Sequence, residues 1–149
     1  MAQSAAGGVL GFFDDVQVGQ ELGPVEDLVT TEMVKKFCLA WGSEIPNRFT
    51  DEETARREGL PTAILPGILN MAVVGKAIEA WAPAGELRRL ETLFRRPVLH
   101  NQPLRVVGTV AAKKVTDDGN QVECDLQLQS ADGETLVIGS AVLILPSKA

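Results

Sequence analysis

The sequence predicts an α+β domain in which one long apolar helix lies in the concave face of a curled antiparallel sheet. The helix is expected over residues 66–81, where apolar side chains occupy nearly all sides, as in a helix that is buried on most faces. The sheet is expected from the second half of the chain, where strand patterns are joined by hairpin signals at 117–120 and 131–133. Helical patterns therefore come first and strands follow, which is typical of α+β domains.

Three further elements are expected ahead of the central helix: a strand over 21–29, a helix over 31–42 and a short helix over 51–58. Pro24 places the strand at a sheet edge, because proline cannot donate a hydrogen bond to a neighbouring strand. Thr30 is suited to cap the first helix, and Thr50 or Asp51 the second. An apolar stripe should turn the first helix toward the core, formed by Met33, Val34, Phe37, Cys38, Ala40 and Trp41.

The start of the central helix is where we expect the functional site. Pro66 suits the first position of this helix, and Gly67 follows it. The free backbone N–H groups at a helix start, together with the positive end of the helix dipole, can hold an oxyanion or a polarised carbonyl group.

Four strands are expected after the central helix, over 88–98, 103–115, 121–130 and 134–145. Residues 121–130 alternate between apolar and polar side chains, so this strand should cover the core on one side and meet water on the other. Residues 134–145 are apolar on both faces, which is more apolar surface than one core helix can cover. We therefore expect the domain to pair through its sheet into a dimer.

The whole chain of 149 residues is expected to form a flexible tail over 1–11 and a single domain over 12–149. Its net charge of −6 argues against nucleic acid or an anionic membrane as the main partner. No secretory pattern is seen, and Cys38 and Cys124 lie among apolar residues, so we expect buried free thiols and a cytoplasmic location. A single histidine and no cluster with ligand spacing predict that no metal is bound.

Three stretches, taken in order, resemble the MaoC-like branch of the hotdog fold, the family of (R)-specific enoyl-thioester hydratases and dehydratases. They are FDDVQVGQELGPVEDLVTTEMVKKFCLAWGS, TDEETARREGLPTAILPGILNMAVVGKAI and LFRRPVLHNQPLRVVGTV, and the resemblance covers about residues 12–145. It implies a hotdog fold, in which a curled antiparallel sheet wraps a long central helix and pairs with a second chain. It also implies an acyl-thioester ligand.

The active-site motif of that family, G-D-x-N-P-x-H, is altered in this chain. The corresponding stretch reads SEIPNRF over 43–49, so Glu44 stands where the family has its catalytic aspartate and Phe49 where it has its histidine. A phenyl ring cannot transfer a proton, so the usual acid–base pair is incomplete. The resemblance implies Glu44 as the general base and the backbone N–H of Gly67 as the donor to the thioester carbonyl.

Further residues are candidates for substrate contact: Asn47, Arg48, Phe49, Asn70, Arg95 and Arg96. Each also has a simpler interpretation, such as a turn residue, a surface arginine or a pocket wall. The resemblance suggests that basic pairs such as Arg95-Arg96 meet coenzyme A phosphates, whereas solvated strand edges are an equal alternative. His100 is expected in an exposed loop.

The expected ligand is therefore an acyl or enoyl thioester of coenzyme A or of acyl carrier protein, and no other cofactor is expected. If the chain is an enzyme, the resemblance implies hydration or dehydration of enoyl or 3-hydroxyacyl thioesters, and thioester hydrolysis or another conjugate addition are alternatives. A different possibility is a non-catalytic subunit whose related partner carries the intact motif. The expected assembly is a homodimer or a heterodimer of hotdog chains.

Overall fold

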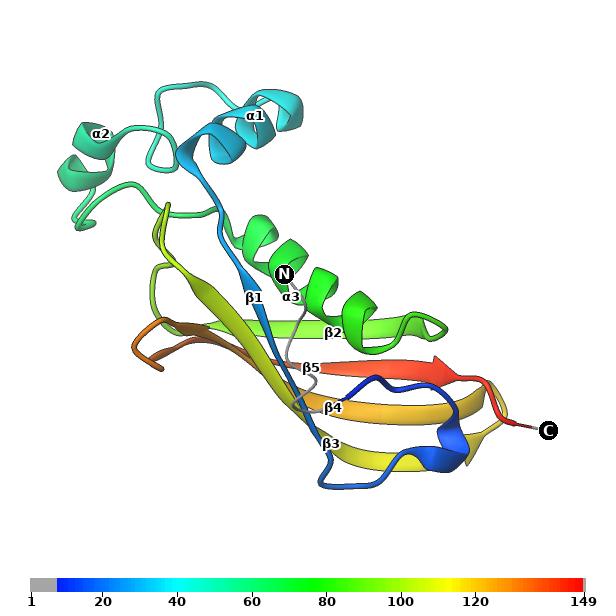
Figure 1. Cartoon of the computed structure of the whole chain (residues 1–149). Helices are drawn as coiled ribbons and strands as arrows, with labels where there is room; N and C mark the ends of the chain where they lie inside the picture. Colours follow the sequence, from blue (N-terminus) through cyan, green and yellow to red (C-terminus); the bar gives the residue numbers. More distant parts are fainter. Residues whose placement is uncertain (1–7, 149) are drawn as a thin grey trace.

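The computed structural model describes residues 8–148 and contains one sheet of five antiparallel strands, with the strand order β1-β3-β4-β5-β2 (Figure 1). The strands are β1 (Glu21–Asp27), β2 (Glu86–Phe94), β3 (Leu104–Thr116), β4 (Gly119–Ser130) and β5 (Thr135–Leu145). The helices are α1 (Thr31–Trp41), α2 (Glu52–Arg57) and α3 (Gly67–Trp81), and a 3-10 turn spans Phe13–Asp15. The predicted α+β class and the order of the elements are confirmed.

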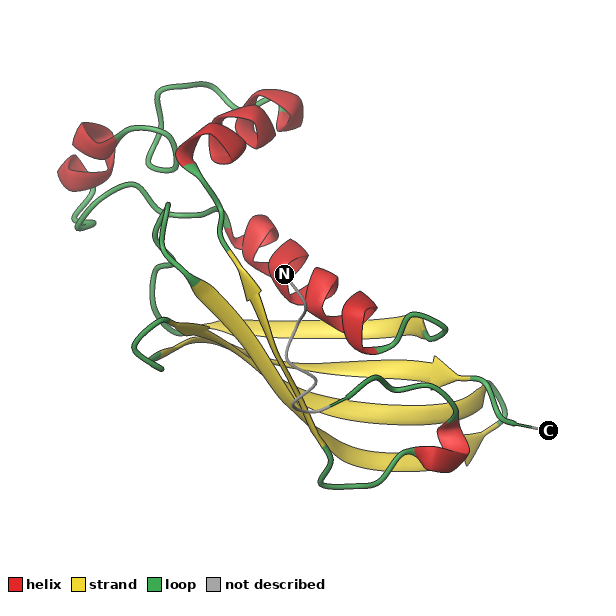
Figure 2. Ribbon diagram, in the orientation of Figure 1, coloured by secondary structure: helices red, strands yellow, loops and turns green. Residues whose placement is uncertain are grey.

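Helix α3 lies along one face of the sheet, and the core forms between them (Figure 2). The inward face of α3 is buried through Asn70, Val73, Val74, Ala77, Ile78 and Trp81. Strand β4 faces it with the alternate residues Val122, Cys124, Leu126 and Leu128, all of which are buried. The alternation predicted for 121–130 is therefore confirmed. Burial raises the pKa of the Cys124 thiol to about 11, with the charge of Asp125 as a second cause.

Polar side chains cap the two short helices. The Thr30 side chain accepts a hydrogen bond from the Met33 N–H at 3.2 Å, as predicted for α1. Asp51 caps α2 through the Thr54 N–H at 2.9 Å, which decides between the two predicted caps, Thr50 and Asp51. The Thr54 hydroxyl also donates to Asp51, and these hydrogen bonds lower the pKa of the Asp51 carboxyl below its usual value.

The central helix begins one residue later than predicted. Pro66 has φ −59° and ψ 145°, and this extended ψ makes it the N-cap residue rather than the first helical residue. Gly67 is therefore the first residue of α3.

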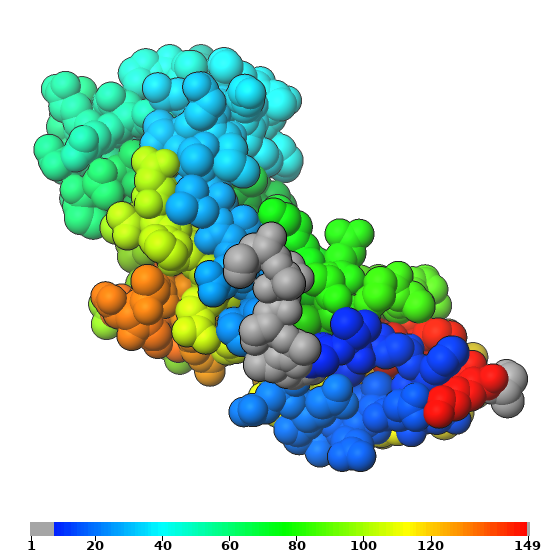
Figure 3. Space-filling model, in the orientation of Figure 1, coloured from blue at the N-terminus to red at the C-terminus, as the bar shows by residue number. Residues whose placement is uncertain are grey.

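Helix α1 does not turn its whole predicted stripe toward the core. Val34 and Cys38 are buried, whereas Met33 is 46% and Trp41 67% exposed. Phe37 and Trp41 stack on each other with ring centroids 5.5 Å apart. The reason is that α1 and α2 stand beyond the end of the sheet, as an overhang past the start of α3 (Figures 1 and 3).

The packed part of the chain begins earlier than the predicted boundary at residue 12. Residues 1–7 of the predicted tail lie outside the described residues, but Leu10 is buried in the core and its N–H donates to the Trp81 carbonyl. Lys113 holds the 3-10 turn Phe13–Asp15 against the sheet, because its Nζ donates to the carbonyl oxygens of Phe13 and Val16 at 2.8 and 2.9 Å.

The two edge strands of the sheet, β1 and β2, differ in sequence and in exposure. Strand β1 carries Pro24 at one edge, as predicted. Strand β2 forms the other edge, and all its residues except Leu90 and Thr92 are exposed. Next to it, β5 buries Ala141, Leu143 and Leu145 on its inner face and leaves Ile138, Val142 and Ile144 half-buried on its outer face.

No helix among the described residues is both long and apolar enough to cross a membrane.

Candidate functional site

The start of α3 offers two backbone N–H donors that are free to bind a ligand as far as the described residues show. The first hydrogen bonds to the Pro66 carbonyl come from the N–H groups of Leu69 and Asn70, at 3.0 and 3.2 Å. Within the described residues, the N–H groups of Gly67 and Ile68 have no acceptor. They point out of the positive end of a 15-residue helix, which suits them to hold a carbonyl or oxyanion oxygen.

A network around His100 holds the segment that leads into α3. The Leu65 N–H donates to the Val98 carbonyl at 2.8 Å. His100 Nε2 lies 3.2 Å from the Ile64 carbonyl, and Nδ1 lies 3.0 Å from Thr31 Oγ1. Because a carbonyl oxygen only accepts, Nε2 carries a proton and donates to Ile64, while the threonine hydroxyl can donate to Nδ1 or accept from it. His100 therefore connects α1, the approach to α3 and the loop between β2 and β3.

The expectation that His100 is exposed is wrong, because its ring is buried. The sequence offered a signal in the neighbouring apolar residues Val98 and Leu99, but it could not show that Thr31 and Ile64 would lie opposite the ring. We assign His100 a positioning role for the start of α3.

Removing the His100 ring is expected to loosen the start of α3. His100→Leu leaves the Ile64 carbonyl without a donor, so we expect a loss of about 1–3 kcal/mol in the free energy of unfolding. Urea denaturation measures this loss, and hydrogen exchange of the Ile64 and Leu65 amides locates it. In His100→Gln the side-chain amide can reach the place of Nε2, so it should recover part of the loss. Unchanged stability and exchange in His100→Leu would contradict the positioning role.

The first turn of α3 is covered by the ring of Phe94 at the end of β2. A Cβ atom built on Gly67 would lie 2.8 Å from Phe94 Cε2, so only glycine allows this approach without displacement of the ring. Phe94 is half-exposed. A rotation of this side chain would therefore uncover the start of α3. No pattern in the sequence indicates this contact.

The loop that carries the altered family motif is organised by Asn47. Its Oδ1 accepts from the N–H groups of Phe49 and Thr50 at 2.9 and 3.1 Å, and its Nδ2 donates to the Glu44 carbonyl at 2.9 Å. This is the turn-residue interpretation of Asn47. Its carboxamide is used within the loop, and the substrate contact expected of it stays a prediction.

The other motif residues divide between the core and the solvent. Phe49 is half-buried and packs against the core. Arg48 pairs with Glu58 at 2.9 Å and lies over the Phe49 ring, with its guanidinium carbon 5.8 Å from the ring centroid. Glu44 is exposed, and within the described residues its carboxylate makes no ion pair. The structure thus places no second acid–base side chain next to Glu44 within the loop, and its role as a base stays a prediction.

Arg95 and Arg96 follow β2, next to Phe94. Both backbone N–H groups donate to the Leu136 carbonyl, at 2.9 and 3.1 Å, and both side chains are exposed. Arg96 pairs with Glu134 at 2.9 Å. Both follow Phe94, which touches Gly67, so their cations belong to the same end of the molecule as the start of α3.

Asn70, in contrast, is a polar residue on the buried face of α3. It is 4% exposed, and its Oδ1 is enclosed without a hydrogen-bond partner in the described residues. It stands three residues after Gly67 and therefore on the same side of the helix. Asn70 and Gly67 are the two predicted site residues that the fold brings together most directly.

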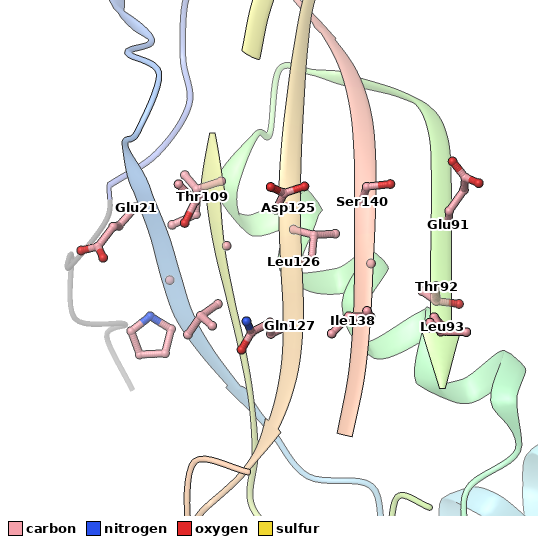
Figure 4. Close-up of a pocket in the computed structure, with 16 residues that line it drawn as sticks. Glu21, Glu91, Thr92, Leu93, Thr109, Asp125, Leu126, Gln127, Ile138 and Ser140 are labelled. Atoms are coloured by element: carbon pink, nitrogen blue, oxygen red, sulfur yellow. The ribbon is translucent and has the colours of Figure 1, made fainter. Parts of the chain in front are cut away.

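A groove of about 750 Å³ lies on the opposite face of the sheet from α3 (Figure 4). A row of polar side chains crosses its strands in register: Glu21, Thr109, Asp125, Ser140 and Glu91. None of its lining residues is a lysine or arginine, and none is a predicted site residue. Three carboxylates without a lining cation disfavour the phosphates of coenzyme A. A thioester site therefore fits the start of α3 better than this groove.

Residues 8–148 contain no group of three His, Cys, Asp or Glu side chains that could hold a metal ion. The candidate site consists of backbone donors, one buried carboxamide and the ring of Phe94. Such a site can bind and polarise a carbonyl group, and it needs a proton donor and acceptor from elsewhere to add water to a double bond.

A family model described as "MaoC like domain" matches residues 49–131. No curated protein matches the sequence significantly.

Solved structures resemble this chain along most of its length, among them a hydratase and two dehydratases. The unliganded R-hydratase PhaJ1 from Pseudomonas aeruginosa is 21% identical, with a TM-score of 0.78 over 91% of this chain and 86% of that chain. A MaoC-like dehydratase from Rhodospirillum rubrum is 20% identical, with a TM-score of 0.78 over 93% and 99%. The truncated HadBC complex of Mycobacterium tuberculosis, a 3R-hydroxyacyl-ACP dehydratase, gives 18% identity and a TM-score of 0.68 over 87% and 98%. At these identities the likeness establishes the fold.

Proposed function

This chain belongs to the MaoC-like domain family and has its hotdog fold, and on this basis we propose that it binds an acyl or enoyl thioester at the start of α3. The thioester carbonyl would accept from the N–H groups of Gly67 and Ile68, which have no acceptor in the described residues. These two free donors at the end of a 15-residue helix are the observation that carries the proposal. The carrier would be coenzyme A or acyl carrier protein, with Arg95 and Arg96 available to its phosphates.

The chain would act as a dimer that forms through β2. This edge strand is exposed, and an antiparallel copy related by a two-fold axis through Leu90 would place Leu90 opposite Leu90. The same axis places Arg89 opposite Glu91 on the outer face, twice in each dimer, so the strand is complementary to itself. A related hotdog chain with a similar edge could replace the second copy, and the structural likeness to the HadBC complex supports such a partner.

The reaction would be hydration or dehydration across the α,β bond, as in the R-hydratase and dehydratases that share the fold. Phe49 packs against the core, and the resemblance puts it where the family has its histidine, so this chain by itself would lack the proton-transferring pair. We therefore favour a subunit role, in which a partner hotdog chain with an intact Asp and His performs the proton transfers. The second candidate is a self-sufficient enzyme with Glu44 as base. It is supported by the observation that, among the described residues, the Glu44 carboxylate forms no ion pair and so remains available to accept a proton.

Purified chain is expected to bind butyryl-CoA in a calorimetric titration and to leave crotonyl-CoA unhydrated when it is alone. Glu44→Gln should leave the affinity for butyryl-CoA unchanged, since Glu44 is exposed on the loop. As a matched control, Glu53→Gln removes a different exposed carboxylate, one on α2.

Two results would separate the candidates. Hydration by the chain alone that falls at least about 100-fold in Glu44→Gln, but not in Glu53→Gln, would replace the subunit role by the self-sufficient enzyme. Absence of binding to butyryl-CoA, crotonyl-CoA and acylated carrier protein would contradict the proposal itself.

A further inference from the structure

Asn70 is a buried residue whose carboxamide oxygen is not used by the part of the chain that the structure describes. It is 4% exposed, and its Oδ1 is enclosed without a hydrogen-bond partner among these residues. A buried polar group without a partner destabilises a folded protein, and such groups in native structures call for an explanation. An apolar residue here would continue the buried face formed by Val73, Val74 and Ala77.

Asn70 stands in the first turn of α3, on the side of the helix that Gly67 also occupies. Side chains on a helix lean toward its N-terminus, so Asn70 reaches back over the turn that begins at Gly67. As far as residues 8–148 show, the first turn thus combines two N–H groups that lack acceptors with a carboxamide oxygen that lacks a donor. These observations are independent, since one concerns the backbone and the other a side chain.

A ligand that bonds to both the free N–H groups and the Asn70 carboxamide needs a carbonyl oxygen and a second polar group a short distance along its chain. Gly67 and Asn70 are separated by about 4.5 Å along the helix axis, at about 1.5 Å per residue. This is comparable to the distance from a thioester carbonyl to a substituent two carbons further along the acyl chain. A hydroxyl group suits a carboxamide in either orientation, because it can donate to Oδ1 or accept from Nδ2.

We propose that Asn70 binds a hydroxyl group on C3 of the acyl chain and so makes the site selective for 3-hydroxyacyl thioesters over unsubstituted ones. The inference rests on the proposed thioester function and adds a specificity-determining residue to it. A site that pairs a buried polar group with a ligand hydroxyl rejects the analogue that lacks the hydroxyl, because the buried group is then left unpaired.

The test compares 3-hydroxybutyryl-CoA with butyryl-CoA, titrated calorimetrically into the full chain. The wild-type chain should bind the hydroxylated thioester about tenfold more tightly, as expected of one added hydrogen bond. In Asn70→Leu the two affinities should become equal while butyryl-CoA still binds. The same substitution should raise the Tm of the free chain by roughly 3–6 °C, because it removes an unpaired buried group. A merely structural asparagine would lower the Tm on replacement.

A second pair of variants covers the case in which leucine does not fit the core. Asn70→Thr and Asn70→Val have nearly the same shape, and only threonine offers a hydrogen-bonding group, so a preference for the hydroxylated thioester should remain in Asn70→Thr alone. Equal binding of both thioesters by the wild-type chain, or a preference that persists in Asn70→Leu or Asn70→Val, would overturn this inference and leave the proposed function standing. Binding of neither thioester would overturn both.

Discussion

Gly67→Pro is expected to lower the hydration of crotonyl-CoA by this chain assembled with its catalytic hotdog partner at least about 100-fold relative to Gly67→Ala, as for the loss of one oxyanion donor. Proline removes the backbone N–H that would hold the thioester carbonyl, whereas alanine keeps it. The first helical position tolerates proline, because its N–H has no partner within the helix. Pro66, with ψ at 145°, already has the extended conformation that a following proline requires.

The alanine variant controls for the added side chain. In both variants a Cβ atom enters the space beside Phe94 Cε2, 2.8 Å away, so any displacement of the ring is shared. Butyryl-CoA binding should weaken about tenfold in Gly67→Pro compared with Gly67→Ala, since one hydrogen bond to the ground-state carbonyl is lost. Circular dichroism checks that α3 is intact in both. Equal affinities and equal rates in the two variants would show that the Gly67 N–H does not contact the ligand.

Leu90→Asp is expected to raise the dimer dissociation constant at least about 100-fold, because it places two carboxylates opposite each other at the two-fold axis of the β2 pair. Sedimentation equilibrium measures the change. Val115→Asp controls for the added charge alone, since it places an aspartate on β3, at a position that is 76% exposed and away from the β2 edge.

A charge exchange tests the same interface without touching the core. Arg89→Glu would face Glu91 of the second copy and should weaken the dimer, and the double variant Arg89→Glu/Glu91→Arg should restore it. Arg89 and Glu91 also pair within one chain, at 2.9 Å, and the double variant keeps that pair with its charges exchanged. A wild-type chain that stays monomeric at high concentration, or a Leu90→Asp dimer as tight as the wild type, would contradict pairing through β2.

The parts of the fold that periodicity determines could be predicted from the sequence. The apolar pattern over 66–81 gave α3 to within one residue, because a helix buried on most sides cannot contain many polar residues. The alternation over 121–130 gave the inner face of β4, because successive strand residues point to opposite faces. The hairpin signals gave the boundaries of β3, β4 and β5 to within a few residues.

Features that depend on contacts between distant segments could not be predicted. The exposure of Trp41 follows from the overhang of α1 beyond the sheet, and the amphipathic pattern of the helix carries no information about what lies opposite it. The burial of His100 depends on Thr31 and Ile64, which are 69 and 36 residues away in the sequence. At the candidate site, the resemblance pointed to Gly67, but the missing partner of Asn70 and the Phe94 ring became visible only in three dimensions.

The two buried thiols can report local unfolding of the segments that carry them. Cys38 and Cys124 are free and buried on two different elements, α1 and β4. The reactive form of cysteine is the thiolate, and with a pKa raised to about 11 the Cys124 side chain stays protonated at neutral pH while it is enclosed. The rate at which iodoacetamide alkylates each cysteine would therefore be limited by the local unfolding that exposes its side chain. The two labelling rates would separate detachment of the overhang from disruption of the sheet.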